Sequence, residues 1–164
     1  MLTTKFSFIF FLGLLSIAGN SQIKYFQNFE DGFEDMILLD QDGKIPADPV
    51  ATYGKTWTID EDENGNHWAV SNSYFTEPAK ANDWLITPLI TNINENSVLQ
   101  WQAFSYNSLF PEQYEVRVSP TGGSNPSDFT KIIYSVSEEG NEVISRGIGL
   151  SEFKGNTIRI AFRN

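Results

Sequence analysis

The chain has 164 residues, which is enough for one domain and too few for two full ones. Lys and Arg total 11 against 21 Asp and Glu, and the net charge of −10 argues against binding to the phosphate backbone of nucleic acids. Aromatic residues make up 14% of the chain, whereas disordered chains lack them. With no Cys and a single His, the sequence excludes disulfides, thiolate chemistry and metal sites that need several His.

The N-terminal segment has the layout of a secretory signal peptide. Lys5 precedes an apolar run over residues 6–18, and small and polar residues follow up to position 22. The alternative is a membrane anchor, but the run is shorter than the roughly 17–25 residues that a spanning helix needs. We therefore predict a signal peptide over residues 1–21, a mature domain over 22–164 without a membrane span, and a protein that is secreted or on the cell surface.

After this segment the sequence consists of short alternating or apolar runs, separated by clusters of Gly, Asn, Pro and Asp. This pattern is typical of a β-sandwich or barrel and leaves little room for helices. The runs that predict strands cover residues 25–29, 56–59, 68–71, 84–90, 98–106, 114–119, 129–136 and 157–162. About eight strands suit an all-β fold, a two-sheet antiparallel jelly-roll sandwich.

Alternation within these runs predicts which side chains form the core. The apolar positions that alternate with polar ones, and that we expect to be buried, are Leu99, Trp101, Val116, Val118, Ile158 and Ile160. The sequence stops directly after the last run, at Asn164. Since that run has the composition of a central strand, we expect the domain to lack its closing strand.

An acidic stretch that begins at Asp60 carries oxygen-bearing side chains at alternate positions. Asp60, Asp62 and Asn64 match the start of an EF-hand loop, and Gly65 permits a sharp turn. The twelfth position has no Glu and no helices flank the loop, so this is not an EF-hand. The stretch is either a cation site or a solvated acidic turn. We predict a structural Ca²⁺ held by Asp60, Asp62, Asn64 and Glu30.

The remaining acidic residues give little indication of catalysis. Residues 40–43 have the composition of a turn. Glu112 and Glu115 flank Tyr114, and the alternation of Glu115 with Arg117 predicts a pair on the outer, solvent-facing surface. Jelly-roll glycosidases carry two carboxylates on one inward strand face, and no run here has such a row. His67 has no partners for a catalytic triad, so we predict no catalytic residues.

Aromatic residues near the predicted loops are candidates for ligand binding. Aromatic rings stack on the faces of sugars much as they stack on each other. Trp84 and Trp101 fall on core-like positions. The residues that we expect to be exposed and to bind a ligand are Trp57, Trp68, Tyr74 and Phe75.

Several motifs occur in a family-specific order: N-F-E-D-G at 28–32, Trp57 ahead of the acidic stretch, N-D-W-L-I-T-P at 82–88 and Y-E-V-R-V-S at 114–119. This order resembles the choice-of-anchor J domains, which are related to the cleaved adhesin domains of secreted bacterial proteases and adhesins. The resemblance covers nearly all of the mature chain. It implies a non-catalytic MAM-like or lectin-like sandwich, often with structural calcium, and a closing strand with an Asp-Asp pair followed by further domains.

We therefore expect a non-catalytic adhesion or binding module of a larger secreted or cell-surface bacterial protein, whose ligand is an extracellular glycan or protein. Two alternatives remain. A structural spacer attached to a secreted hydrolase predicts that all four candidate aromatics are buried and that no concave face exists. A glycoside hydrolase of lectin-like fold predicts a pair of carboxylates in an open groove.

Overall fold

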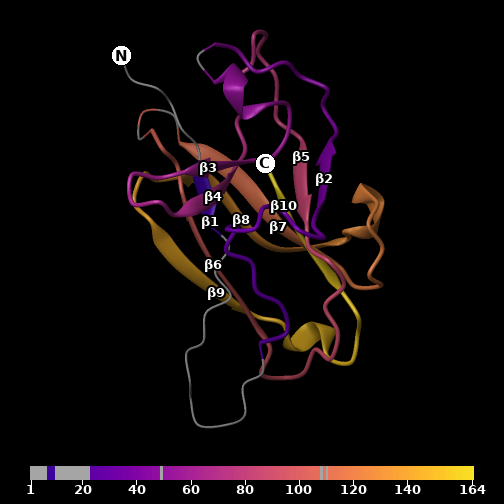
Figure 1. The fold of residues 1–164 in the computed structure, drawn as a ribbon. Coiled ribbons are helices and arrows are strands. Elements are labelled where there is room, and N and C mark those ends of the chain that lie inside the picture. Colours follow the sequence, from indigo (N-terminus) through magenta and orange to yellow (C-terminus); the bar gives the residue numbers. More distant parts are fainter. Residues whose placement is uncertain (1–6, 10–22, 49, 108, 110) are drawn as a thin grey trace.

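The computed structural model describes residues 7–9, 23–48, 50–107, 109 and 111–164. These residues form two five-stranded sheets that pack face to face (Figure 1). Within this part of the chain, no helix has the length and apolar character that a membrane span requires. The predicted signal peptide lies outside the described residues, apart from residues 7–9.

Both sheets are antiparallel throughout, so the predicted two-sheet antiparallel sandwich is confirmed. The first sheet contains, in spatial order, β3 (Thr58–Glu61), β4 (His67–Val70), β1 (Ser7–Ile9), β6 (Val98–Phe104) and β9 (Ile144–Gly149). The second contains β2 (Ile37–Asp40), β5 (Asp83–Ile86), β10 (Arg159–Arg163), β7 (Glu112–Ser119) and β8 (Lys131–Glu139). Three short 3-10 turns join strands at Ala51–Tyr53, Pro126–Asp128 and Ser151–Phe153.

Seven of the eight predicted runs contain or overlap a strand, and the prediction for residues 25–29 is wrong. There the Gln27 side chain accepts the amide of Phe29 at 2.6 Å. Phe29 has a φ of 64°, outside the extended region that a strand requires. Conversely, strands β1, β2 and β9 were not predicted from the sequence. Strand β9 contains two glycines, which weaken the strand signal, and its pairing with β6 is a tertiary contact.

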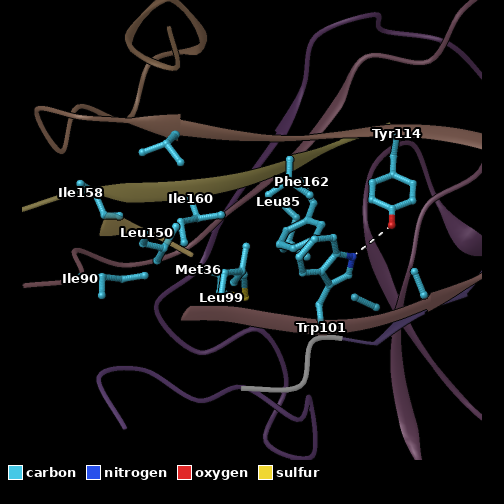
Figure 2. Packing of buried hydrophobic residues seen from close by; sticks show 14 of the residues in the cluster. Met36, Leu85, Ile90, Leu99, Trp101, Tyr114, Leu150, Ile158, Ile160 and Phe162 are labelled. Carbon is cyan, nitrogen blue, oxygen red and sulfur yellow. Dashed lines mark hydrogen bonds between the residues drawn. The ribbon is translucent and has the colours of Figure 1, made fainter. Parts of the chain in front are cut away.

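The core lies between the sheets and contains all six predicted core residues, each at most 1% exposed. Trp101 of β6 and Tyr114 of β7 connect the two sheets. The indole Nε1 of Trp101 donates a hydrogen bond to the Tyr114 hydroxyl at 3.0 Å (Figure 2). Buried Trp and Tyr need such a partner for their polar atoms. The alternating pattern therefore predicted the packed interior correctly.

A second polar link between the sheets is formed by Arg146 of β9. Its Nη2 donates to Glu139 Oε1 at 2.8 Å, and its Nε donates to the Tyr134 hydroxyl at 2.7 Å. Glu139 is 1% exposed, so this is a buried ion pair. Breaking such a pair on one side leaves an uncompensated charge, which makes the link sensitive to substitution.

Strand β1 lies between β4 and β6, within the segment predicted to be the signal peptide. Phe8 pairs with Ala69 of β4 and with Ala103 of β6. This short strand thus occupies a central position in the first sheet. Its presence there depends on residues that a signal peptidase would remove.

Candidate functional site

The acidic stretch forms the tip of the β3–β4 hairpin. In the register of this hairpin, Asp60 lies opposite Trp68, and Glu61 lies opposite His67. The Asp62 amide donates to the Asn66 carbonyl at 2.9 Å, which closes the loop. Gly65 has a φ of 83°, a left-handed conformation that glycine adopts without strain. The hairpin therefore projects its carboxylates from the end of the first sheet.

Asp62 organises the tip of this hairpin. Its Oδ1 accepts the amides of Asn64 at 2.8 Å and of Asn66 at 3.0 Å, and its Oδ2 accepts the Trp68 indole at 3.1 Å. The Asn66 side-chain amide contacts both oxygens. These hydrogen bonds, led by those from Asn66, lower the pKa of Asp62 to about 2. The negative charge of Asp62 is thus stabilised by donors of its own loop.

Glu30 reaches the hairpin from the segment before β2, but it pairs with His67. Glu30 Oε2 lies 2.8 Å from His67 Nδ1, and Oε1 accepts the His67 amide at 3.4 Å. This hydrogen bond raises the pKa of His67 and lowers that of Glu30. Asp60 accepts the Tyr53 hydroxyl at 3.3 Å.

The Ca²⁺ site expected at Asp60, Asp62, Asn64 and Glu30 stays a prediction, and the observed geometry does not fit it well. A cation would have to compete with the donors that already occupy the Asp62 and Glu30 oxygens. Glu30 contacts His67. As arranged, the Asp62 and Glu30 carboxylates accept hydrogen bonds from residues of the hairpin.

Beside the hairpin lies a hollow of about 440 Å³ that is lined by acidic and aromatic residues. Its lining consists of residues 60–64 together with Trp68, Phe104 and Tyr106. The Trp68 and Phe104 rings meet edge to face, with centroids 4.9 Å apart. Tyr106 is 44% exposed and offers its ring and hydroxyl to solvent. The hollow combines hydrogen-bond acceptors and negative charge with a surface for stacking.

The expected exposure of the four candidate aromatics is wrong for three of them. Trp57, Trp68 and Phe75 are 3%, 8% and 9% exposed, because the sandwich and its loops cover their rings. Tyr74 is 54% exposed, but it does not line the hollow. Of the four, only Trp68 does so. Phe104 was missed, although it follows Trp101 at odd spacing and therefore lies on the opposite face of β6.

A second acidic cluster lies at one end of the other sheet. One carboxylate oxygen each from Asp40, Asp42 and Asp83 lies within 4.8 Å of the other two. The β2–β5 register places Asp40 directly opposite Asp83. The turn predicted at 40–43 is consistent with this geometry, since Asp40 Oδ1 accepts the amides of Asp42 and Gly43 at 3.1 and 2.6 Å. The approach of Asp83 from the neighbouring strand was not predicted from the sequence.

Asp83 is the buried member of this cluster, at 2% exposed. Burial raises the pKa of Asp83 to about 7, the carboxylates of Asp42 and Asp40 add to the shift, and the hydroxyls of Thr56 and Ser71 offset part of it. Asp83 Oδ1 is enclosed and has no hydrogen-bond partner among the described residues. Across the same residues, none of the three carboxylates takes part in an ion pair.

Glu112 corrects another expectation, because it faces the interior and not solvent. It is 5% exposed, and the Ser73 hydroxyl contacts its two oxygens at 2.7 and 2.9 Å. Burial raises its pKa to about 7. Glu115 behaves as predicted and pairs with Arg117 at 2.7 Å, with Arg163 as a second partner at 3.1 Å.

The fold defines this protein as an all-β, two-sheet antiparallel sandwich. The family model described as Cleaved Adhesin Domain matches residues 23–162, and the chain therefore belongs to the cleaved adhesin domain family. This confirms the family resemblance seen in the sequence motifs.

Two solved structures have a similar fold. The K3 cleaved adhesin domain of Lys-gingipain (Kgp) from Porphyromonas gingivalis W83 aligns with a TM-score of 0.61 at 18% identity, over 83% of this chain and 86% of that chain. The K1 domain of the same protein aligns with a TM-score of 0.58 at 20% identity, over 80% of this chain and 84% of that chain. A comparison with curated proteins gave no match.

Proposed function

We propose that this protein is a non-catalytic adhesion module, exported as part of a larger bacterial polypeptide, and that its ligand occupies the acidic hollow. The observation that carries this proposal is the hollow itself, which residues 60–64 line together with Trp68, Phe104 and Tyr106. Membership of the cleaved adhesin domain family supports an adhesive role. Export is supported by the signal-peptide layout of residues 1–21, with the mature domain beginning at residue 22.

The chemistry of the hollow favours a protein ligand with Lys or Arg side chains over a neutral glycan. Asp60, Glu61, Asp62 and Glu63 all contribute to its lining. Carboxylates form charge-assisted hydrogen bonds with cationic groups, and aromatic faces attract the same cations. The net charge of −10 adds long-range attraction for a basic partner. A neutral glycan would use the stacking surface without this electrostatic term.

The two alternative functions receive less support from the geometry. The spacer alternative predicts that all four candidate aromatics are buried, but Tyr74 is exposed and a hollow exists. The hydrolase alternative requires paired carboxylates in an open groove. Glu112 and Glu139 do lie opposite one another, but both are buried, and they contact Ser73 and Arg146.

Binding of a decalysine peptide, compared with a neutral gluco-oligosaccharide, tests the proposal. We expect saturable binding of the peptide that weakens as salt rises from 50 to 300 mM, because exposed charges are screened over about 8–10 Å at physiological ionic strength. Glu61→Gln combined with Glu63→Gln should weaken peptide binding, and so should Tyr106→Ala. Glu61 and Glu63 are exposed, so these changes leave the core intact.

Two matched variants serve as controls. Glu77→Gln removes an exposed carboxylate outside the hollow, and Tyr74→Ala removes an exposed aromatic outside it. Both should bind the peptide like the unmodified chain. Equal loss in Glu77→Gln and in the Glu61/Glu63 variant would mean that net charge, and not the hollow, attracts the peptide. Binding of the oligosaccharide alone would contradict the preference for a basic protein ligand.

A further inference from the structure

We propose that a protein ligand of this domain adds an extended strand to the first sheet, in the slot between β4 and β6 that β1 occupies. In strand addition, main-chain hydrogen bonds provide affinity and the side-chain positions provide specificity. The inference rests on the proposed adhesive function and deepens it, because the slot adjoins the acidic hollow. The hollow selects the charge of the ligand, whereas the slot selects an extended main chain.

The slot is one strand wide and has a strand edge on each side. Strand β1 is antiparallel to both neighbours, and Phe8 lies opposite Ala69 of β4 and Ala103 of β6. Neighbouring strands lie about 4.8 Å apart, so β4 and β6 are separated by about twice that distance. The other edge of β4 pairs with β3, and that of β6 pairs with β9. The edges that face the slot therefore have β1 as their strand partner.

The proposed export opens this slot. Cleavage after residue 21 removes β1 and leaves two facing strand edges in the middle of the first sheet. With β1 in place, Ala69 and Ala103 are 0% exposed and belong to the main core. Unpaired main-chain groups at such a place are costly, and free strand edges are templates for pairing with another chain. A strand that fills the slot therefore stabilises the mature domain.

The core face of the slot selects a large apolar side chain. A residue in the register of Phe8 shares its face of the sheet with Ala69 and Ala103, which lie directly opposite it on the two sides. Since both neighbours carry only a methyl group, a larger side chain between them is needed to fill the interior. A charged residue there would lie uncompensated in the core. The ligand strand should therefore have Phe, Leu or Ile at its central position.

The outer face of the slot leads to the acidic hollow. Trp68 and Phe104 belong to β4 and β6, the two strands that flank the slot, and their ring centroids are 4.9 Å apart. Both rings also line the hollow. Because side chains alternate along a strand, the positions next to the central one lie on this outer face. One peptide can therefore occupy the slot with its main chain and reach the hollow with its outward side chains.

The direction of β1 predicts where the basic residues of the ligand belong. Strand β1 runs antiparallel to β4 and is thus directed toward the start of β4 at His67. His67 directly follows the hairpin tip, which carries Asp62 and Glu63. A ligand strand with the same direction leaves the slot beside these carboxylates. Charge complementarity then favours Lys or Arg directly after the apolar residues of the ligand strand.

A peptide based on β1 tests this binding mode. It has the sequence Thr-Ser-Phe-Ile-Thr-Lys-Lys-Lys with capped ends, and the protein is the processed chain of residues 22–164. We expect saturable binding of one peptide per chain by calorimetry. Hydrogen exchange of the β4 and β6 amides should slow by about tenfold or more, while exchange of the β7 amides should not change.

Two altered peptides and the full chain serve as controls. Replacing the central Phe by Asp should weaken binding by about tenfold or more, because it places a charge in the core. N-methylation of the main chain at that Phe should have an effect of similar size, because each amide of a central strand donates to one of its two neighbours. The full chain, in which β1 fills the slot, should also bind the peptide about tenfold more weakly.

Circular dichroism shows whether the processed chain folds without the peptide. If it does not, Phe8→Asp in the full chain provides the same test, because it weakens β1 without removing any residue. This variant should bind the peptide more tightly than the unmodified full chain does. Equal binding by these two full-length proteins would overturn the proposal.

The adhesive function and this binding mode can fail separately. If decalysine binds, and the strand peptide binds equally well with Asp or N-methylated Phe, the hollow is the ligand site and strand addition is overturned. If the strand peptide binds with the expected sensitivity while decalysine does not, the slot is supported and the hollow is contradicted. Binding of neither peptide would overturn both. Dimers of the processed chain with protected β4 and β6 amides would assign the slot to a second copy and overturn strand addition by a ligand.

Discussion

Glu112 and Glu139 lie directly opposite one another on β7 and β8, and both side chains are buried. The two carboxyl groups have different partners. Glu139 forms an ion pair with Arg146 at 2.8 Å, whereas the Glu112 carboxyl contacts the Ser73 hydroxyl. The charge of Glu139 is thus compensated by Arg146, whereas burial favours the neutral form of the Glu112 carboxyl group.

The first prediction concerns pH. Because burial raises the pKa of Glu112 from 4.5 to about 7, the folded state binds more protons than the unfolded state between these values. Stability therefore falls as pH rises through this window, in total by on the order of 3 kcal/mol for this group. Glu112→Gln should remove this contribution. Urea unfolding at pH 4.5, 6 and 7.5 measures the free energy of unfolding of the unmodified chain and of Glu112→Gln. An identical pH dependence in the two proteins would contradict the raised pKa of Glu112.

The second prediction concerns the Arg146–Glu139 link between the sheets. Arg146→Met should destabilise the fold by about 3–5 kcal/mol, because it leaves the Glu139 carboxylate buried without a cation. Combining it with Glu139→Gln should recover part of the loss, since the uncompensated charge is then gone. Chemical denaturation of the two single variants and the double variant measures this coupling. A double variant less stable than Arg146→Met would exclude the charge explanation.

The third prediction concerns the hairpin tip at low pH. Since the pKa of Asp62 is lowered to about 2, its stabilising effect is present above pH 3.8 and is lost as pH falls toward 2. Asp62→Ala should give the same loosening at neutral pH. Amide exchange at Asn64 and Asn66, together with the Trp68 indole proton signal, reports it by NMR. Exchange that stays slow in Asp62→Ala would show that the β-turn alone holds the loop.

The fourth prediction concerns β1. If residues 1–21 are removed, β4 and β6 lose the strand that pairs with Ala69 and Ala103. The amides of β4 and β6 that face β1 should then exchange faster in a chain of residues 22–164 than in the full chain. Amides of β7 in the other sheet are the internal reference. Equal exchange in the two chains would mean that this pairing contributes nothing to the sheet.

Local patterns accounted for the fold class and for the strand residues at the centre of the core. Alternation along β6, β7 and β10 placed Trp101, Val116 and Ile160 inside, because side chains on a strand point to opposite faces at every step. The Asn-Gly composition of the 62–66 tip predicted a turn for an equally local reason. In contrast, no strand forms at residues 25–29, where the Phe29 amide donates to the Gln27 side chain and Phe29 has a left-handed φ.

Pairings between distant segments decided the candidate sites. Asp40 and Asp83 are 43 positions apart in the sequence, yet the β2–β5 register places them directly opposite one another. Glu112 was expected at the surface, but the tertiary structure buries it and places the Ser73 hydroxyl against its carboxyl group. Trp57 and Phe75 lie next to loops in the sequence, but Trp57 packs in the main core and Phe75 pairs with Pro46. The sequence by itself determined where most of the strands form and which of their side chains face the core, since apolar and polar residues alternate between adjacent positions. Only the tertiary structure decided which carboxylates meet and which aromatics reach solvent, because both depend on strand register and on the path of the loops.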